Sequence, residues 1–185
     1  MPDPGEKRGP WLIRDSQVKY ENHWMRVRED LVVQPDGKDG IYGVAEVLPG
    51  VMILPMDEDK NVYLASEYHY GAEKMTLEGL GGGIEEGESP LDAAKRELAE
   101  EAGIVALEWT EMGMTDTFTS ILGTPWTWLF LAQKLEMRKP HREGTETMEI
   151  VEIPFEQVVR MAMEDGVTES VTLALIFRVN EKMKR

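Results

Sequence analysis

A glycine-rich loop runs into a helix-forming segment between Gly82 and Ile104, and this stretch constrains the fold more than any other part of the sequence. Ser89 or Asp92 can cap the start of the helix. Pro90 suits a first-turn position, and Gly103 is the expected stop. Between these limits a narrow apolar stripe has helical spacing and predicts packing against a core; it consists of Ala93, Ala94, Leu98 and Ala102.

The same predicted helix carries a crowded row of carboxylates. Glu97, Glu100 and Glu101 stand at i, i+3 and i+4, which places them on one face. Like charges at these spacings cost roughly 0.2–0.5 kcal/mol per pair on an exposed helix. Arg96 can orient one carboxylate through a bidentate pair but cannot neutralise three. A hard cation with oxygen ligands removes the conflict, and Mg²⁺ is the natural candidate because it fills its shell with water and phosphate oxygens.

Helices rich in Glu and Ala are usually solvated surface elements, so the carboxylates alone do not establish a site. The preceding loop favours the functional interpretation, because its glycines allow sharp turns and a close approach to a ligand. Glu88 then falls eight residues before Arg96. The loop glycines are Gly79, Gly81, Gly82, Gly83 and Gly87.

The segment from Gly82 to Ile104 resembles the Nudix box, G-x5-E-x7-R-E-U-x-E-E-x-G-U with U aliphatic, at every fixed position. In that family the box forms a loop–helix–loop that binds divalent metal and hydrolyses a nucleoside diphosphate linked to another group. The resemblance implies roles for six residues. They are Glu97, Glu100, Glu101 and the carbonyl of Gly81 as metal ligands, Glu88 as a supporting carboxylate, and Arg96 as the group that orients the glutamates.

Composition agrees with a small enzyme that needs a cation. A chain of 185 residues is long enough for one domain with a modest N-terminal extension. Its formal charge of −15 argues against nucleic acid or an anionic membrane surface as a partner. The chain has no cysteine, which excludes disulfides and thiolate chemistry. No apolar run is long enough to span a membrane, and we expect cytoplasmic residence.

The hydrophobic pattern predicts an α/β protein of the Nudix fold, an α/β/α sandwich with a mixed sheet and an added N-terminal antiparallel β-hairpin. Pro35-Asp-Gly37 is a strong hairpin signal between two predicted strands. We expect a disordered arm over residues 1–10 and a β extension for dimerisation and base binding over 11–48. Residues 49–185 would form the catalytic domain, with closing helices near 155–164 and 169–184.

Segments outside the box resemble the branch that hydrolyses ADP-ribose and other nucleoside diphosphate sugars. They are the hairpin at 35–37 and the residues 50–57, 62–68, 153–156 and 167–174. The resemblance implies a homodimer that exchanges N-terminal strands and helps to build both active sites. It also implies cleavage by water into a nucleoside monophosphate and a sugar phosphate, with Mg²⁺ or Mn²⁺ as the cofactor.

This branch places nucleobase-stacking aromatics where Trp24 and Tyr42 fall, and the resemblance allows Trp24 to reach across the dimer. Stacking on an aromatic side chain is worth about 1–3 kcal/mol per base. The alternative is that both are ordinary strand aromatics. Arg26 and Arg28 alternate on one strand face, where they could contact phosphate or remain solvated strand charges.

A water nucleophile needs a base or a cation that lowers its pKa. In the branch this base is often a glutamate on a loop before the last strand. The resemblance assigns catalytic roles here to Glu146, with Glu143 next and Glu149 expected inside the strand, and to Glu101 and Arg96 of the box. His69 replaces an arginine common in the branch, and we expect it to pack or hydrogen-bond rather than bind metal.

Two other function classes stay open. A Nudix hydrolase could act on dinucleoside polyphosphates or nucleoside triphosphates, although the predicted N-terminal strands argue against the minimal enzymes of that kind. A non-catalytic Nudix module could bind a nucleotide sugar. Such modules usually lose box glutamates, whereas this chain keeps all of them.

Overall fold

The computed structural model describes residues 1–123, 126–138 and 148–184, and it divides into two compact units. The first unit contains residues 1–48 with 118–123, and the second contains the remaining described residues. The segment 118–123 therefore packs with the N-terminal extension rather than with the residues that flank it. Its backbone forms a parallel bridge from Leu122 to Ala45.

The first unit is a four-stranded antiparallel sheet in the order β1-β2-β3-β4. Its strands are β1 (Lys7–Arg8), β2 (Trp11–Glu21), β3 (Arg26–Val33) and β4 (Asp39–Glu46). The turn between β3 and β4 contains Gly37 at φ +85°, as the hairpin signal predicts. Where the sequence predicts a disordered arm over residues 1–10, the chain instead folds back through Gly5 and Gly9, both at positive φ, and pairs β1 with β2.

The two faces of this sheet differ in burial. Val32 pairs with Ile13, and both are buried on one face. On the opposite face Leu31 pairs with Ile41, and these side chains are 42% and 64% exposed. Tyr20, which pairs with Val27, is also exposed on that face at 54%. The alternation of side chains along a strand thus leaves one face covered and the other both open and partly apolar.

The second unit contains two three-stranded sheets in the orders β10-β6-β7 and β5-β9-β8. Their strands are β5 (Gly50–Pro55), β6 (Asn61–His69), β7 (Lys74–Glu78), β8 (Ile104–Asp116), β9 (Trp126–Met137) and β10 (Glu149–Pro154). The helices are α1 (Pro90–Ala102), α2 (Phe155–Met163) and α3 (Ser170–Met183). β5 pairs with β9 in parallel, whereas β8 pairs with β9 antiparallel, so this sheet is mixed as expected.

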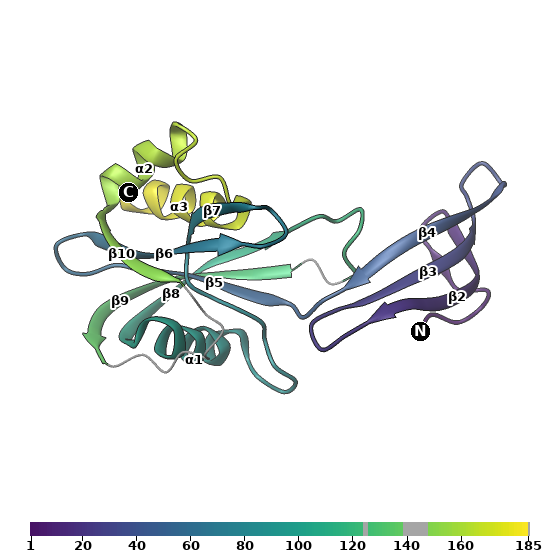
Figure 1. Ribbon diagram of the computed structural model, residues 1–185, viewed down its shortest axis with the longest axis horizontal. Helices are drawn as coiled ribbons and strands as arrows, with labels where there is room; N and C mark the ends of the chain where they lie inside the picture. The colour runs from purple at the N-terminus through teal and green to yellow at the C-terminus, as the bar shows by residue number, and fades with distance from the viewer. Residues whose placement is uncertain (124–125, 139–147, 185) are drawn as a thin grey trace. The chain divides into compact units, whose positions relative to one another are not determined.

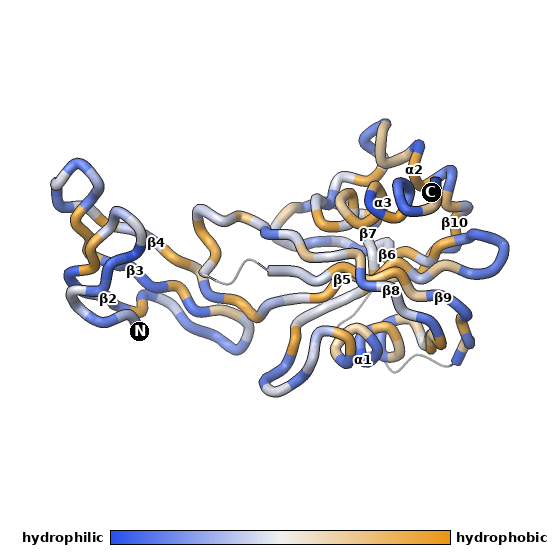
Figure 2. The backbone as a smooth tube through the Cα atoms, turned by 180° about the vertical axis from the view of Figure 1, so that it is seen from behind, coloured by the Kyte–Doolittle hydropathy of each residue, from blue (hydrophilic) through white to orange (hydrophobic). Residues whose placement is uncertain are grey.

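Two hydrophobic cores lie on opposite sides of the sheet strands. Val51 and Ile53 of β5 pack in the core that contains the apolar stripe of α1. Leu54, the next residue, packs in the core formed with α2 and α3, and Met52 packs against the same core. In Figure 1, α1 covers one side of these strands and α2 and α3 cover the other. Figure 2 shows apolar colour along β5 and β9 between the helices. The predicted α/β/α sandwich is therefore confirmed, and β5 reads as a continuous apolar run because both of its faces are buried.

The sequence pattern did not predict one strand of the second unit. β7 pairs with β6 and directly precedes the glycine-rich loop. Its residues show little apolar periodicity, and their exposure decreases from Lys74 to Glu78. The hairpin partner rather than the local pattern establishes this strand. None of the helices in the described part of the chain is long and apolar enough to cross a membrane.

Candidate active site

The glycine-rich loop is fixed to β5 by main-chain hydrogen bonds. Ile53 N donates to Leu80 O at 2.7 Å, and Leu80 N donates to Ile53 O at 3.0 Å. Val51 N donates to Gly82 O at 2.9 Å, and Ile84 N donates to Pro49 O at 2.8 Å. The loop therefore follows β5 as an added strand edge before the chain enters α1.

At two loop glycines, neighbouring atoms occupy the space that a side chain would need. A Cβ on Gly81 would collide with the carbonyl oxygen of Val51. A Cβ on Gly82 would lie 2.6 Å from Cδ of Glu97, which is closer than real Cβ atoms approach other atoms. The first glycine of the box thus makes room for a carboxylate of the box helix.

Helix α1 begins and ends as its sequence predicts. Ser89 is the N-cap residue, and its hydroxyl oxygen accepts a hydrogen bond from Asp92 N at 3.2 Å. Gly103 ends the helix in the left-handed region at φ 63°. Ala93, Ala94, Leu98 and Ala102 are buried, so the apolar stripe faces the core. Glu97 and Glu100 lie outside this stripe, whereas Glu101 is buried beside it.

Arg96 links three of the box carboxylates to the loop. Its Nε donates to Glu88 Oε1 at 3.0 Å and its Nη2 to Glu88 Oε2 at 2.9 Å, a bidentate pair. Its Nη1 lies 2.8 Å from Glu97 Oε1 and 3.3 Å from Glu100 Oε2. Nη2 also donates to the carbonyl oxygen of Gly83 at 2.9 Å. One guanidinium thereby orients Glu88, Glu97 and Glu100 at the same time.

The charges around Arg96 stabilise one another. The Arg96 hydrogen bonds hold the pKa of Glu88 below its ordinary value. The same partners, Glu88 first and then Glu97, raise the pKa of Arg96. Glu88 and Arg96 therefore both stay ionised at neutral pH, which preserves their bidentate pair.

Glu101 lies apart from the Arg96 cluster and is only 8% exposed. Its Oε2 accepts a hydrogen bond from Gly81 N at 3.0 Å. This contact joins the last box glutamate to the residue immediately before the box. The N–H of Gly81 therefore bonds to Glu101 and not to β5. The main-chain hydrogen bonds of β5 go to Leu80 and Gly82, the residues on either side of Gly81.

The donor set at this site fits a hard divalent cation. Glu97, Glu100, Glu101 and the Gly81 carbonyl offer oxygen atoms, which Mg²⁺ prefers. The space that Gly82 leaves beside Glu97 admits a carboxylate close to the loop backbone. Of these groups only Glu100 is largely exposed, and Arg96 already orients it. The residues present are therefore compatible with the cation that the box implies.

A second group of possible ligands lies on the β6–β7 hairpin. One ligand atom each from Glu67, His69 and Glu78 lies within 4.8 Å of the others, and this is the only such group among the described residues. His69 Nε2 is 2.6 Å from Glu78 Oε1, so His69 hydrogen-bonds as the sequence predicts. Burial raises the pKa of Glu78, although the contact with His69 opposes this shift.

The two aromatics predicted to stack on a base are not neighbours in the first unit. Trp24 lies in the turn between β2 and β3 and is 78% exposed. Tyr42 lies opposite Asp30 in the sheet. Asp30 is four residues along β3 from Arg26, the end of the strand next to Trp24, which corresponds to roughly 13 Å at the rise of a strand. Tyr42 instead packs edge-to-face on Trp11 with ring centroids 5.3 Å apart. Trp11 was not singled out from the sequence, because a lone aromatic at the start of a strand has no distinguishing pattern.

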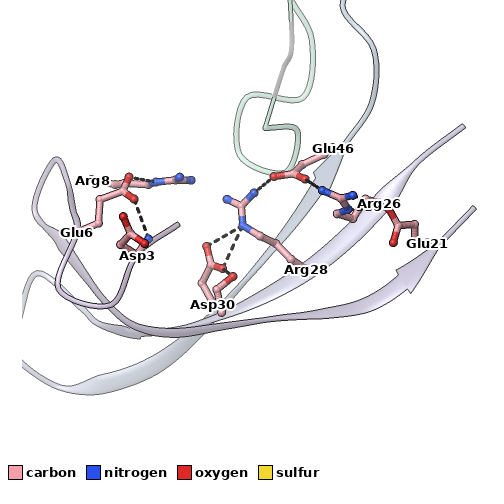
Figure 3. A network of polar contacts seen from close by, with 9 residues as sticks. Asp3, Glu6, Arg8, Glu21, Arg26, Arg28, Asp30 and Glu46 are labelled. Carbon is pink, nitrogen blue, oxygen red and sulfur yellow. Dashed lines mark hydrogen bonds and ion pairs between the residues drawn. The ribbon is translucent and has the colours of Figure 1, made fainter. Parts of the chain in front are cut away.

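The two strand arginines have different surroundings. Arg26 is exposed and donates to Glu21 at 2.6 Å. Arg28 is buried at 2% exposure, where its Nε donates to Asp30 at 3.1 Å and its Nη1 to Glu46 (Figure 3). The two residues do lie on one face, as alternation predicts. Sequence reasoning missed the burial of Arg28, and the strand pattern holds no signal for it, because its neighbours on that face are Arg26 and Asp30.

The loop glutamates proposed as the base, Glu143 and Glu146, lie outside the described residues. Glu149 is the first residue of β10 and pairs with Ser66 of β6, so it lies in a strand as expected.

Comparison with family models gives two matches that together cover most of the chain. Residues 47–173 match the model of the NUDIX domain. Residues 8–45 match the model of the nucleoside diphosphate sugar hydrolase N-terminal domain. The border between the two matches falls beside the end of β4.

Curated relatives and solved structures are similar over most of their lengths. An ADP-ribose pyrophosphatase of Bacillus subtilis (strain 168) is 26% identical over 141 residues, 75% of each chain. The ADP compounds hydrolase NudE of Escherichia coli (strain K12) is 28% identical over 134 residues, 72% of this chain and 71% of that one. A methanol dehydrogenase activator of Bacillus methanolicus is 22% identical over 174 residues, 89% of each. A crystal structure of an ADP compounds hydrolase matches with a TM-score of 0.83 over 97% of both chains, at 24% identity, and shows the same fold.

Proposed function

The chain belongs to the NUDIX family and is a pyrophosphohydrolase, and we propose that it cleaves nucleoside diphosphate sugars in a reaction that depends on Mg²⁺. The arrangement around Arg96 carries this proposal, because one guanidinium orients Glu88, Glu97 and Glu100 beside the glycine loop. The match of residues 8–45 to the N-terminal domain of nucleoside diphosphate sugar hydrolases favours this substrate class. The products would be a nucleoside monophosphate and a sugar phosphate.

We assign the cation to Glu97, Glu100, Glu101 and the carbonyl of Gly81. A bound divalent cation lowers the pKa of water and offsets charge on the phosphate oxygens. Glu101 holds the loop backbone at Gly81 N, so its carboxylate has a fixed position relative to the loop. Arg96 and Glu88 position the other ligands. Glu146, or Glu143, is proposed to accept the proton of the attacking water.

We propose that the first unit contributes to substrate binding. Trp24 is exposed, which leaves its ring available to a nucleobase held partly by a second copy of the chain. Arg26 retains an exposed guanidinium that could reach phosphate. Tyr42 packs on Trp11, and Arg28 donates to Asp30 and Glu46. We propose that these two residues contact substrate while they keep these contacts within the first unit.

A panel of substrates tests the activity. We expect Mg²⁺-dependent release of nucleoside monophosphate from ADP-ribose, GDP-mannose or UDP-glucose, separated by chromatography, and no release when EDTA removes the cation. Mn²⁺ in place of Mg²⁺ tests which cation serves better. Turnover confined to diadenosine polyphosphates or nucleoside triphosphates would agree with a hydrolase but would contradict the proposed sugar-linked substrate class. No metal-dependent turnover of any compound would instead favour a binding module.

We propose that the chain forms a homodimer through the first unit, with the strand exchange that the sequence resemblance implies. The exposed apolar face of its sheet supports this proposal, because Tyr20, Leu31 and Ile41 project from it without cover among the described residues. Arginine at Ile41 would place a charge in the centre of the interface. We expect Ile41→Arg to be monomeric in sedimentation analysis while the wild-type chain is dimeric, with Lys38→Arg in the adjacent turn as the control. A monomeric wild-type chain would contradict the proposal.

A further inference from the structure

The β6–β7 hairpin carries three ligand groups that lie outside the box (Figure 1). Glu67 and His69 stand two residues apart on β6 and project from one face of the hairpin. Glu78 ends β7 and projects from the same face, because it lies opposite Ala65 in the register. One ligand atom from each of the three residues lies within 4.8 Å of the others. The strand pairing therefore gathers one imidazole and two carboxylates, although the sequence places neither a second histidine nor a cysteine beside His69.

The carboxylates of this hairpin group (Glu67, His69 and Glu78) repel one another. The Glu78 side chain is only 14% exposed, and this burial raises its pKa. The contact with His69 opposes the shift, whereas repulsion from Glu169 and Glu67 adds to it. Lys74 lies opposite His69 in the register, but its ammonium group donates to a threonine hydroxyl of another segment at 3.1 Å. A divalent cation between the three ligand groups would offset the repulsion.

Glu67 offers a carboxylate that is not engaged elsewhere in the described ranges. Its side chain makes no hydrogen bond and no ion pair with the residues that the structure describes, and it is half-buried on the hairpin. Glu67 can therefore turn toward a cation without breaking a contact with those residues.

The contact between His69 and Glu78 can open to admit a metal ion. His69 Nε2 lies 2.6 Å from Glu78 Oε1. Zinc bonds of about 2.0–2.2 Å separate two tetrahedral ligand atoms by roughly 3.3–3.6 Å, so these two atoms must move apart by about 1 Å or less. The His69 side chain is 41% exposed, which leaves it room for this movement. The metal ion then takes the place of the proton that joins Nε2 to Oε1.

The mixture of ligand atoms determines the class of cation. The box offers oxygen atoms alone, which suit Mg²⁺, whereas the hairpin group adds an imidazole nitrogen. Imidazole nitrogen favours Zn²⁺ and related transition metal ions over Mg²⁺ and Ca²⁺. Three protein ligands leave the fourth tetrahedral position to water.

We propose that Glu67, His69 and Glu78 form a second cation site, which binds Zn²⁺ through one imidazole nitrogen and two carboxylate oxygens. The site ties β6 to β7 directly before the glycine-rich loop begins. It does not depend on the proposed hydrolytic activity, because it is defined by binding and by residues outside the box.

The test follows the imidazole rings of the full chain while Zn²⁺ is added in the presence of excess Mg²⁺. The chain has three histidines, and His69→Gln identifies the ring signals of His69 in a two-dimensional ¹H–¹⁵N NMR spectrum. We expect Zn²⁺ to shift the His69 Nε2 signal until one ion is bound per chain, and EDTA to reverse the shift. Mg²⁺ alone should leave the signal unchanged. His23→Gln, which removes an exposed histidine of the first unit, should retain the full zinc response.

Glu67→Gln is the informative variant, because it keeps the shape of the side chain and breaks no contact within the described ranges. We expect it to weaken the binding of Zn²⁺ about ten-fold or more, since a neutral amide is a poorer ligand than a carboxylate. Glu73→Gln is the matched control, because Glu73 is an exposed glutamate in the turn of the same hairpin. Its affinity for Zn²⁺ should equal that of the wild-type chain.

Glu101→Gln separates the hairpin group from the box. The zinc response of His69 should persist in this variant, whether or not the chain proves to be a hydrolase. Loss of the response in Glu101→Gln would assign the zinc ion to the box and overturn the proposal. The proposal would also be overturned by an unchanged His69 signal in the presence of Zn²⁺, by an equal shift with Mg²⁺ alone, or by wild-type affinity in Glu67→Gln.

Discussion

Glu101→Gln is expected to lower kcat/KM by on the order of a hundred-fold or more while the protein stays folded. The amide oxygen can still accept the hydrogen bond from Gly81 N, which Glu101 Oε2 accepts in the structure. The side chain keeps its shape in a site that is 8% exposed, but it loses the negative charge that a cation ligand needs. Steady-state rates at saturating Mg²⁺ and a thermal melt by circular dichroism measure the two effects.

The matched control for this variant is Glu86→Gln. Glu86 lies in the same loop, is exposed, and occupies a variable position of the box. Its substitution removes the same charge from the protein and should leave the rate within about two-fold of wild type. Near-full activity of Glu101→Gln would show that this residue does not hold the cation.

Gly82→Ala should also lower the activity of the protein, through geometry rather than charge. The added Cβ would lie 2.6 Å from Cδ of Glu97, so the carboxylate has to move from its position beside the loop. Displacement of one ligand is expected to cost on the order of 10–100-fold in cation affinity or activity. The measurement is a Mg²⁺ titration of the hydrolysis rate, with the wild-type and variant chains compared at equal folded fraction.

Gly71→Ala provides the control for a glycine substitution in the same unit. No atom lies within 4 Å of a Cβ built on Gly71, and its φ is not in the left-handed region. We expect its rate and its Mg²⁺ dependence to match wild type. If Gly82→Ala behaves in the same way, the close approach of Glu97 to the loop has no functional consequence.

The helix of the site was predictable because its signals are local. Ser89, Pro90 and Gly103 determine where α1 begins and ends, and the apolar stripe determines which side is buried. The sandwich followed from strand patterns of the same kind, and β5 could be identified by its continuous apolar run. The carboxylate face then required no information beyond helical spacing.

Features that depend on distant residues could not be predicted. The contact of Gly82 with Glu97 needs the loop to be fixed to β5, and the pairing of β1 needs two glycine turns. Arg28 looked like a surface arginine because its carboxylate partners include Glu46 on the neighbouring strand, eighteen positions away in the chain. Tertiary pairing of this kind leaves no periodic signal in a single sequence.

The glycine-rich loop looks flexible in the sequence, since glycine allows more backbone conformations than any other residue. Its main-chain hydrogen bonds to β5 instead make the loop rigid, because β5 is buried on both faces and contributes side chains to both cores. Local opening of the loop therefore requires separation from one of the most protected strands in its unit. The carboxylate-bearing face of α1 therefore lies beside a rigid loop, and the glycines serve close packing rather than mobility.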